Sequence, residues 1–188
     1  MHALIALLFF LAEPFWETKP PEQWTDHEIE IMRGSSPWTQ IIGPSPELTV
    51  YFATAEPIEA AEAEARLHKL KPLPEPDPDY LEFLHENREK VFVLAVNYPS
   101  LAGLSKDPDA WKTLEKETRM KVGGKTYKIE GEFPPTPSDS VLRLVFPRQV
   151  KPTDKRVDLQ LYLPGLPFPE REVEFYMKDL TYHGKLAM

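Results

Sequence analysis

The 188-residue chain contains no cysteine. Disulfide bonds, thiolate metal sites, a cysteine nucleophile and a lipid-modified cysteine anchor are therefore all excluded. Asparagine and glutamine are also scarce, whereas proline is abundant at 21 residues. A fold without disulfide bonds must be stabilised by its hydrophobic core, and a chain of this length can bury a core of ordinary size.

The sequence also lacks a concentrated basic segment. Its formal net charge is −8, and the acidic excess lies in the first half of the chain. Nucleic-acid binding relies on clustered lysine and arginine side chains, so we expect no nucleic-acid partner. We interpret the acidic side chains as a solvated face, with attraction of a cation or a basic partner as the alternative.

No apolar run is long enough for a transmembrane helix, which needs about 20 residues. The longest uncharged apolar run, residues 3–12, has the length of a signal-peptide core, although no lysine or arginine precedes it and its cleavage motif is weak. We predict a signal peptide over 1–12, export to the periplasm or the extracellular space, and a mature chain without a transmembrane span. A buried N-terminal strand or helix is the alternative.

Four segments in the C-terminal third alternate apolar and polar residues with a period of two. These segments span 126–129, 142–146, 157–163 and 173–178. Successive side chains of a strand point to opposite faces, so each segment predicts a strand with one buried face. Leu161 and Phe175 occupy the centres of two of these buried faces.

Two further segments complete the predicted sheet structure. Residues 91–98 are apolar on both faces, which indicates a central strand that is covered on both sides. Gly123 and Gly124 predict the turn of a hairpin. Short strands without intervening helices predict a mainly β (α+β) fold: an antiparallel β-sandwich, immunoglobulin-like or a partly open barrel, of about seven or eight strands. We expect the last strand to cover 181–187.

Three or four short helices are expected in the N-terminal half. Thr25 and Glu28 match a capping box, and Gly34 stands where a helix that begins there would be capped at its end. Proline in the first turn is typical of the remaining helix starts. These starts are Pro57 and the Asp-Pro-Asp sequences at 77–79 and 107–109.

The predicted domain organisation is simple. Residues 13–23 are rich in proline and aromatic residues, so we expect an irregular leader. Residues 24–188 are expected to form a single β-sandwich domain with helices at its N-terminal side.

Residues that could support chemistry do not fall into a recognised pattern. Gly124-Lys125-Thr126 resembles the end of a phosphate-binding loop, but the alternating residues after it indicate a hairpin. Asp26 and Glu30 share a helix face that could hold a metal ion, although capping and solvation explain both acids. The sequence therefore assigns no catalytic, metal-binding or cofactor-binding residue, and we predict no cofactor.

Three of the four tryptophans, Trp16, Trp24 and Trp38, lie within the first 38 residues. If these rings were exposed, they would form an interaction surface for a sugar or a protein partner. If they were buried, they would fix the N-terminal arm and helix to the β core. Pro14, Pro37 and the capping box beside them favour the buried arrangement.

Two segments near the ends of the chain carry a resemblance. Residues 24–38 end in Ser-Pro-Trp, and residues 178–186 read Lys-Asp-Leu-Thr-Tyr-His-Gly-Lys-Leu. Together they resemble a group of uncharacterised exported bacterial proteins with a helix followed by Ser-Pro-Trp and a closing Lys-Asp-Leu/Met-x-Tyr-x-Gly-Lys-Leu strand. The resemblance implies export and a single domain. The group has no established activity, so no functional residue is transferred.

These observations favour a non-catalytic exported binding or structural module of the cell envelope or extracellular space, with a protein partner there. One alternative is a hydrolase acting on envelope or extracellular polymers, and another is an accessory subunit of an envelope assembly that docks through its leader. A deep pocket with convergent ionisable groups would favour the hydrolase. An exposed apolar patch on a flat sheet would favour the binding module.

Overall fold

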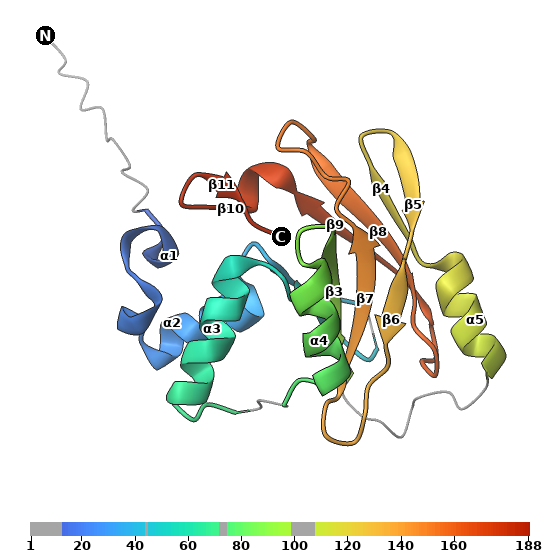
Figure 1. Ribbon diagram of the computed structural model, residues 1–188, viewed down its shortest axis with the longest axis horizontal. Coiled ribbons are helices and arrows are strands. Elements are labelled where there is room, and N and C mark those ends of the chain that lie inside the picture. Colours follow the sequence, from blue (N-terminus) through green and yellow to red (C-terminus); the bar gives the residue numbers. More distant parts are fainter. Residues whose placement is uncertain (1–12, 44, 72–74, 99–107) are drawn as a thin grey trace, which may run out of the picture.

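The computed structural model describes residues 13–43, 45–71, 75–98 and 108–188. The predicted signal peptide, 1–12, lies outside the described residues, as does Asp107 of the second Asp-Pro-Asp sequence. The described chain forms two antiparallel sheets, with most of its helices in the N-terminal half (Figure 1). This confirms the predicted α+β, mainly β, sandwich-like class. Among the described helices, none has the length and apolarity needed to cross a membrane.

The helices are short, and several follow a proline. They are α1 (Phe15–Thr18), η1 (Pro21–Gln23), α2 (Asp26–Ser35), α3 (Glu56–Leu67), α4 (Pro78–Asn87), α5 (Pro108–Glu117) and η3 (Met177–Asp179). The expectation of an irregular leader over 13–23 was wrong, because α1 and η1 lie within it. Pro14 and Pro20 immediately precede these two turns and Pro21 begins the second, where the fixed φ of proline favours a helix start.

The described residues contain eleven strands, more than the seven or eight expected. They are β1 (Thr39–Ile42), β2 (Leu48–Phe52), β3 (Val91–Asn97), β4 (Arg119–Val122), β5 (Lys125–Lys128), β6 (Gly131–Phe133), β7 (Val141–Pro147), β8 (Arg156–Tyr162), β9 (Glu170–Tyr176), β10 (Thr181–Tyr182) and β11 (Lys185–Leu186). Both β1 and β6 were missed, because neither short segment shows a clear alternation.

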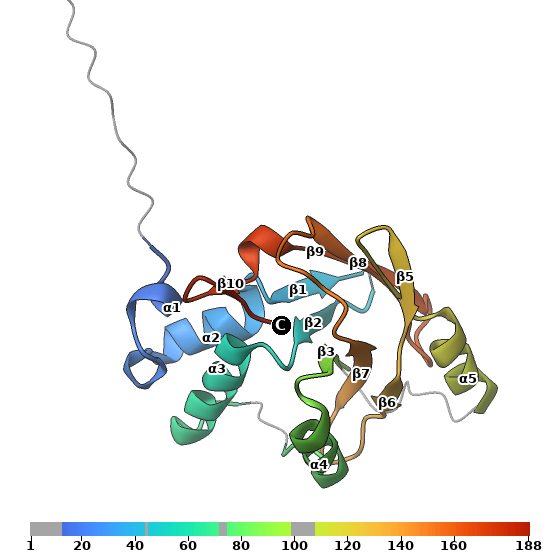
Figure 2. The same ribbon diagram turned by 45° about the horizontal axis from the view of Figure 1, so that its top comes forward.

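The strands form two sheets and a small ribbon. Sheet A has the order β1-β2-β3-β7-β6, sheet B the order β5-β4-β8-β9, and β10 pairs with β11. The edges of the two sheets approach each other where the Gln40 side-chain amide of β1 donates to the Glu174 carbonyl of β9. Figure 2 shows β1 beside β9 in the turned view, which gives the sandwich a partly barrel-like shape.

The main core lies between the two sheets. Phe52 of β2 and Phe175 of β9 meet with ring centroids 4.4 Å apart, and Phe92 stacks on Phe146 within sheet A at 5.6 Å. Leu161 and Phe175 are both buried, so the predicted face assignment of β8 and β9 is confirmed. The inward side chains of sheet A and sheet B belong to one continuous cluster.

α4 covers the outer face of sheet A over β3 and β7, whereas β8 and β9 alternate buried and exposed residues. Val91, Val93 and Val145 point outward from β3 and β7 and pack against Tyr80 and Leu84 of α4. The prediction that 91–98 forms a doubly covered strand is therefore confirmed. Figure 1 shows α4 in front of β3 and β7, with α2 and α3 at one end of the molecule and α5 at the other.

The capping box predicted at the start of α2 is present. The Thr25 hydroxyl accepts from the Glu28 backbone N–H at 3.2 Å, and the Glu28 carboxylate accepts from the Thr25 N–H at 2.9 Å. Gly34 does not cap the helix as expected, because α2 continues to Ser35 and ends in the extended residue Ser36.

The last expected strand, 181–187, is instead a hairpin. β10 and β11 are joined by His183 and Gly184, whose φ angles are 49° and 73°. Two successive residues with positive φ form the tight turn that matches the twist of paired strands. The alternating pattern of this segment spans the turn, which is why it read as one strand.

Candidate functional site

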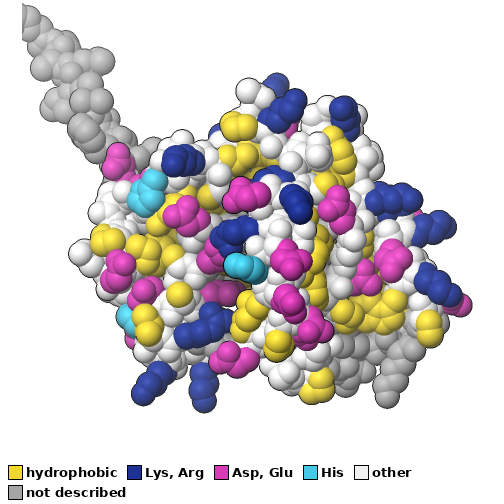
Figure 3. Space-filling view, viewed as in Figure 1, with side chains coloured by type: hydrophobic (Ala, Val, Ile, Leu, Met, Phe, Trp, Pro, Cys, Tyr) yellow, Lys and Arg dark blue, Asp and Glu magenta, His cyan; other side chains and the backbone are white. Residues whose placement is uncertain are grey.

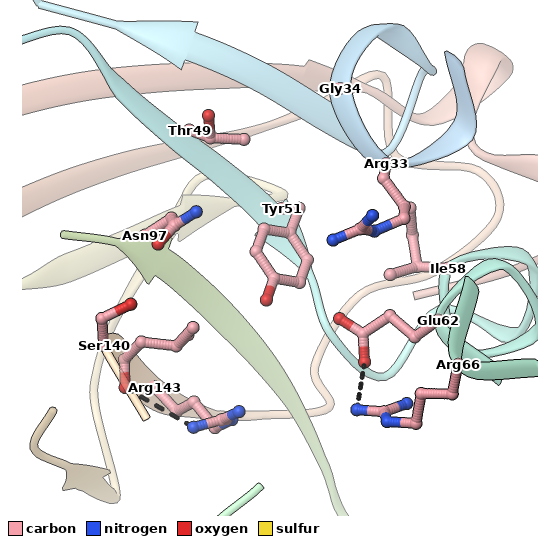
Figure 4. A pocket seen from close by; sticks show the side chains of 11 residues that line it. Arg33, Gly34, Thr49, Tyr51, Ile58, Glu62, Arg66, Asn97, Ser140 and Arg143 are labelled. Atoms are coloured by element: carbon pink, nitrogen blue, oxygen red, sulfur yellow. Dashed lines mark hydrogen bonds and ion pairs between the residues drawn. The ribbon is translucent and has the colours of Figure 1, made fainter. Parts of the chain in front are cut away.

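A polar hollow on the outer face of sheet A has a volume of about 160 Å³ and lies between α2, α3 and strands β2, β3 and β7. We call it the outer groove. Its principal side chains are Arg33 of α2, Tyr51 of β2, Glu62 and Arg66 of α3, and Arg143 of β7 (Figure 4). Side chains from four separate elements thus converge on one site, although none of them is adjacent to another in the sequence.

Strand and helix periodicity explain this convergence. In β2, Leu48, Val50 and Phe52 point into the core, so Thr49 and Tyr51 must point outward. On α3, Glu62 and Arg66 are separated by one helical turn and therefore lie on the same face. The groove is the place where this face of α3 lies opposite outward side chains of the sheet.

Arg143 is held in place by an ion pair and an aromatic ring. Its Nη1 atom lies 2.5 Å from Oδ2 of Asp139, and both side chains are buried. Asp139 also accepts from the Val141 backbone N–H at 3.2 Å. The guanidinium of Arg143 lies 4.5 Å from the centroid of the Tyr80 ring, a cation–π distance. Its charge is therefore compensated by Asp139 and its position is fixed.

Glu62 and Arg66 form a looser pair, with 3.9 Å between Oε2 and Nη2. Burial of the Glu62 carboxyl raises its pKa above the usual value of 4.5, and this rise is opposed by the nearby charges of Arg66, Arg143 and Arg33. Burial also raises the pKa of Tyr51, assisted by the charge of Glu62. Tyr51 therefore remains a neutral hydroxyl across the physiological pH range.

Three arginines line the outer groove of a protein that is acidic overall. These are Arg33, Arg66 and Arg143, and the carboxylates of Glu62 and Asp139 lie among them. The chain as a whole has a net charge of −8. Basic and acidic side chains interleave on this side of the molecule (Figure 3). The guanidinium groups of the three arginines are the part of the groove that would attract an anion.

The outer groove continues between α3 and α4. A second hollow of about 170 Å³ shares Tyr51, Glu62, Arg66 and Arg143 with the first and extends to Tyr80 of α4. The two hollows therefore form one elongated depression across sheet A.

The three tryptophans of the predicted interaction surface lie together elsewhere. Trp24 and Trp38 are buried, and their indole N–H groups donate to the carbonyls of Lys19 at 3.2 Å and Ala187 at 2.7 Å. Trp16 is half-buried. The arrangement matches the structural interpretation of these residues, because Trp24 and Trp38 present almost no surface to a ligand.

These rings belong to a chain of edge-to-face contacts that we call the aromatic ladder. Its members are Trp24, Phe15, Trp16, Trp38 and Tyr182, with successive ring centroids 5.0–6.4 Å apart. The ladder joins the leader, the start of β1 and the β10–β11 ribbon, and none of its members lines the outer groove.

The other candidates from the sequence have structural roles in this fold. Asp26 lies with its Oδ1 atom 2.6 Å from Nδ1 of His68, a contact between the start of α2 and the end of α3. Gly123 and Gly124 form the turn between β4 and β5, so the predicted hairpin is confirmed.

The residues of the outer groove were not predicted as a site. One sequence signal was present: Arg143 interrupts the otherwise apolar segment 141–146, where a covered strand should have no charge without a partner. The partner, Asp139, is close in sequence. The contributions of α2 and α3 depend on tertiary packing and have no such signal.

The chain matches no protein-family model, no curated protein and no solved structure. The resemblance to exported bacterial proteins stays a prediction, and the groove must be interpreted from its own geometry.

Proposed function

We propose that the protein is an exported, non-catalytic binding module that holds a small anionic ligand in the outer groove. The observation that carries this proposal is the convergence of Arg33, Arg66 and Arg143 on one partly enclosed hollow. Guanidinium groups are planar, permanently charged donors, and they bind carboxylates and phosphates through paired hydrogen bonds. A hollow lined by them is therefore suited to retaining an anion.

The chemistry of the lining supports binding more than catalysis. Arginine does not exchange protons near neutral pH, and the raised pKa of Tyr51 keeps its hydroxyl neutral there. These groups can orient a ligand without reacting with it. Arg143 is held by Asp139 before any ligand arrives, so little conformational entropy is lost on binding.

Export is supported by the sequence of residues 3–12 and by the resemblance of the two chain ends. N-terminal sequencing of the native protein tests it. A mature chain that begins near Glu13 in the periplasm or medium is expected, whereas an intact Met1 in the cytoplasm would contradict export.

Ligand binding is tested by isothermal titration with small organic and inorganic anions, using the wild-type protein and Arg66→Gln. We expect at least one anion to bind the wild type and to bind the variant more weakly by about tenfold or more. Arg156→Gln, which alters an exposed arginine on sheet B, is the matched control and should bind as the wild type does. If Arg66→Gln and Arg156→Gln behave alike, the groove is not the binding site.

A hydrolase remains the second candidate, because Glu62 has the raised pKa typical of a general acid and lies in a hollow beside Tyr51. Incubation with extracellular polysaccharides and peptides tests this candidate. Turnover by the wild type that is abolished in Glu62→Gln would replace the binding module with the enzyme.

The third alternative, an accessory subunit docking through its leader, has less support. The leader residues Phe15 and Trp16 pack against the core through the aromatic ladder, which leaves less of them available to a partner.

A further inference from the structure

The geometry points to a uronic-acid type of ligand in the outer groove: a sugar ring that carries one carboxylate and several hydroxyl groups. This inference rests on the proposed function of the groove as an anion site, and it adds the class of anion. It follows from the fact that the two ends of the hollow differ in chemistry and are separated by an aromatic side chain.

The charged end of the hollow is formed by the helices. Arg33 extends from α2, and Arg66 and Glu62 extend from α3 across from the sheet (Figure 4). Arg33 and Arg66 are half-buried, so their guanidinium groups are partly shielded from water and still accessible from the hollow. Such groups can hold a carboxylate through two parallel hydrogen bonds.

The opposite end is formed by the sheet and is rich in uncharged hydrogen-bonding groups, with Arg143, whose charge is compensated by Asp139, beside them. Thr49 of β2 and Asn97 of β3 are paired in the register of sheet A, and Ser140 immediately precedes β7 on the far side of Asn97. Hydroxyl and amide groups both donate and accept, as sugar hydroxyls do. A bare phosphate or acetate could occupy the arginine end, but it would leave these groups without a ligand contact.

Tyr51 lies between the two ends (Figure 4). It follows Thr49 by two positions on the same face of β2, so the two side chains emerge about 7 Å apart. An aromatic ring in this place offers an apolar surface to the C–H face of a sugar and a neutral hydroxyl at its tip.

Glu62 adds selectivity at the charged end. A second carboxylate on the ligand would approach Glu62, whereas a hydroxyl group there could donate to it. The groups that face Glu62 are Arg33 from α2, Tyr51 from β2, Arg66 from α3 and Arg143 from β7. As the pH falls through the raised pKa of Glu62, the groove gains positive charge, so uronate binding should strengthen while the ligand itself stays ionised.

The second hollow suggests where the rest of a longer ligand would lie. It continues from Tyr51 and Arg143 toward Tyr80, with a volume similar to that of the first. A free monosaccharide would fill the first hollow, and the end of a uronic-acid polymer would occupy both. Comparing the affinity for a monomer with that for a trimer distinguishes a free sugar acid from the end of a polymer as the ligand.

The test is isothermal titration of the full chain with galacturonate, galactose, acetate, inorganic phosphate and a trimer of galacturonic acid. We expect galacturonate to bind about tenfold more tightly than acetate, phosphate or galactose, because only galacturonate engages both ends of the hollow. The trimer should bind more tightly still if the polymer is the source, and no more tightly than the monomer if the free sugar acid is. Binding of galacturonate no tighter than that of acetate would overturn the inference.

Substitutions in the groove test where galacturonate binds. Arg66→Gln should weaken galacturonate binding by about tenfold or more, and Asn97→Asp should weaken it because the added carboxylate repels the ligand. Arg156→Gln is the control, and circular dichroism establishes that each variant is folded. If phosphate binds in an Arg66-dependent manner and galacturonate does not, the ligand class is wrong and the proposed function stands. If none of these anions nor any in the wider panel binds, both fail.

Discussion

The two sheets share one core but differ in what covers their outer faces. β8 and β9 of sheet B alternate buried and exposed residues, whereas β3 and β7 of sheet A are buried on both sides. A sheet with one wet face can be built from strict alternation. Where a sheet is covered on both faces, the side chains beneath the helices must also be buried favourably.

The outer face of sheet A has two parts, and the buried side chains differ between them. Beneath α4 the outward side chains are valines, and burial of apolar surface stabilises the contact. Between α3 and α4 they are Tyr51 and Arg143, and the buried charge of Arg143 requires the carboxylate of Asp139. The two parts of this face are therefore stabilised differently, and the polar part contains the arginine side chains that can bind an anion.

The largest expected difference between neighbouring residues lies in β9. Phe175→Ala should lower the free energy of unfolding by about 3–5 kcal/mol, because the buried ring contacts Phe52 across the two sheets. Tyr176→Ala, one residue later on the wet face, should have only a small effect. Urea denaturation measures both, and similar losses for the two variants would show that sheet B is covered on both sides.

Trp38 tests whether the end of the sandwich is packed as firmly as its centre. Trp38→Ala removes a fully buried ring and its hydrogen bond to the Ala187 carbonyl, so we expect a loss of about 3 kcal/mol or more. Trp16→Ala, which alters a half-buried member of the same ladder, should cost less. Thermal unfolding followed by circular dichroism would contradict the structural role of Trp38 if the two variants were equally stable.

The polar half of sheet A is tested by Asp139→Asn. The substitution leaves the buried charge of Arg143 without its carboxylate, so the free energy of unfolding should fall by about 3 kcal/mol. Glu174→Gln breaks the Arg156–Glu174 ion pair on the wet face of sheet B and serves as the matched control. We expect little change there, because solvent screens exposed pairs. Equal effects would mean that Arg143 is hydrated in solution.

The apolar half of sheet A is tested by Val93→Ala. Val93 is fully buried beneath α4, and loss of its two methyl groups should cost about 2 kcal/mol. Leu94→Ala, on the inner face one residue later, should cost about 2–5 kcal/mol. In β3, unlike in β9, substitution of either of two successive residues should therefore lower the free energy of unfolding. Chemical denaturation showing a negligible effect of Val93→Ala would indicate that α4 is not firmly docked in solution.

The smallest effect is expected outside the sheets, at the start of α2. The hydrogen bond from Lys19 and the backbone N–H of Thr25 lower the pKa of Glu28 to about 2. Because the folded-state pKa is depressed, the stabilisation is present above about pH 4.5 and is lost as the pH falls toward 2. Glu28→Ala should therefore cost about 1 kcal/mol at pH 7.

That cost should shrink in acid, where the wild-type carboxylate also becomes protonated. Glu30→Ala, an exposed acid on the same helix, is the control and should show neither effect. Urea denaturation at pH 7 and pH 3 makes the comparison. A constant difference between wild type and Glu28→Ala would show that the charge of Glu28 contributes nothing.

The sequence predicted the regular parts of the molecule because local patterns determine them. The alternation around Leu161 and Phe175 identified β8 and β9, and the Thr25–Glu28 pair identified the start of α2. Chain reversals and contacts between distant segments were harder to predict from the sequence. The His183–Gly184 turn interrupts a continuous alternation, and no local pattern brings Arg33 to Tyr51.

The aromatic ladder has a practical consequence for spectroscopy. Three of the four tryptophans belong to it, while Trp111 lies on α5 at the other end of the molecule. Intrinsic emission from this protein is therefore dominated by one corner, where the leader meets the last hairpin. A change in emission wavelength would report the loosening of that corner, and a Trp111→Phe variant would make it a reporter free of signal from the far end.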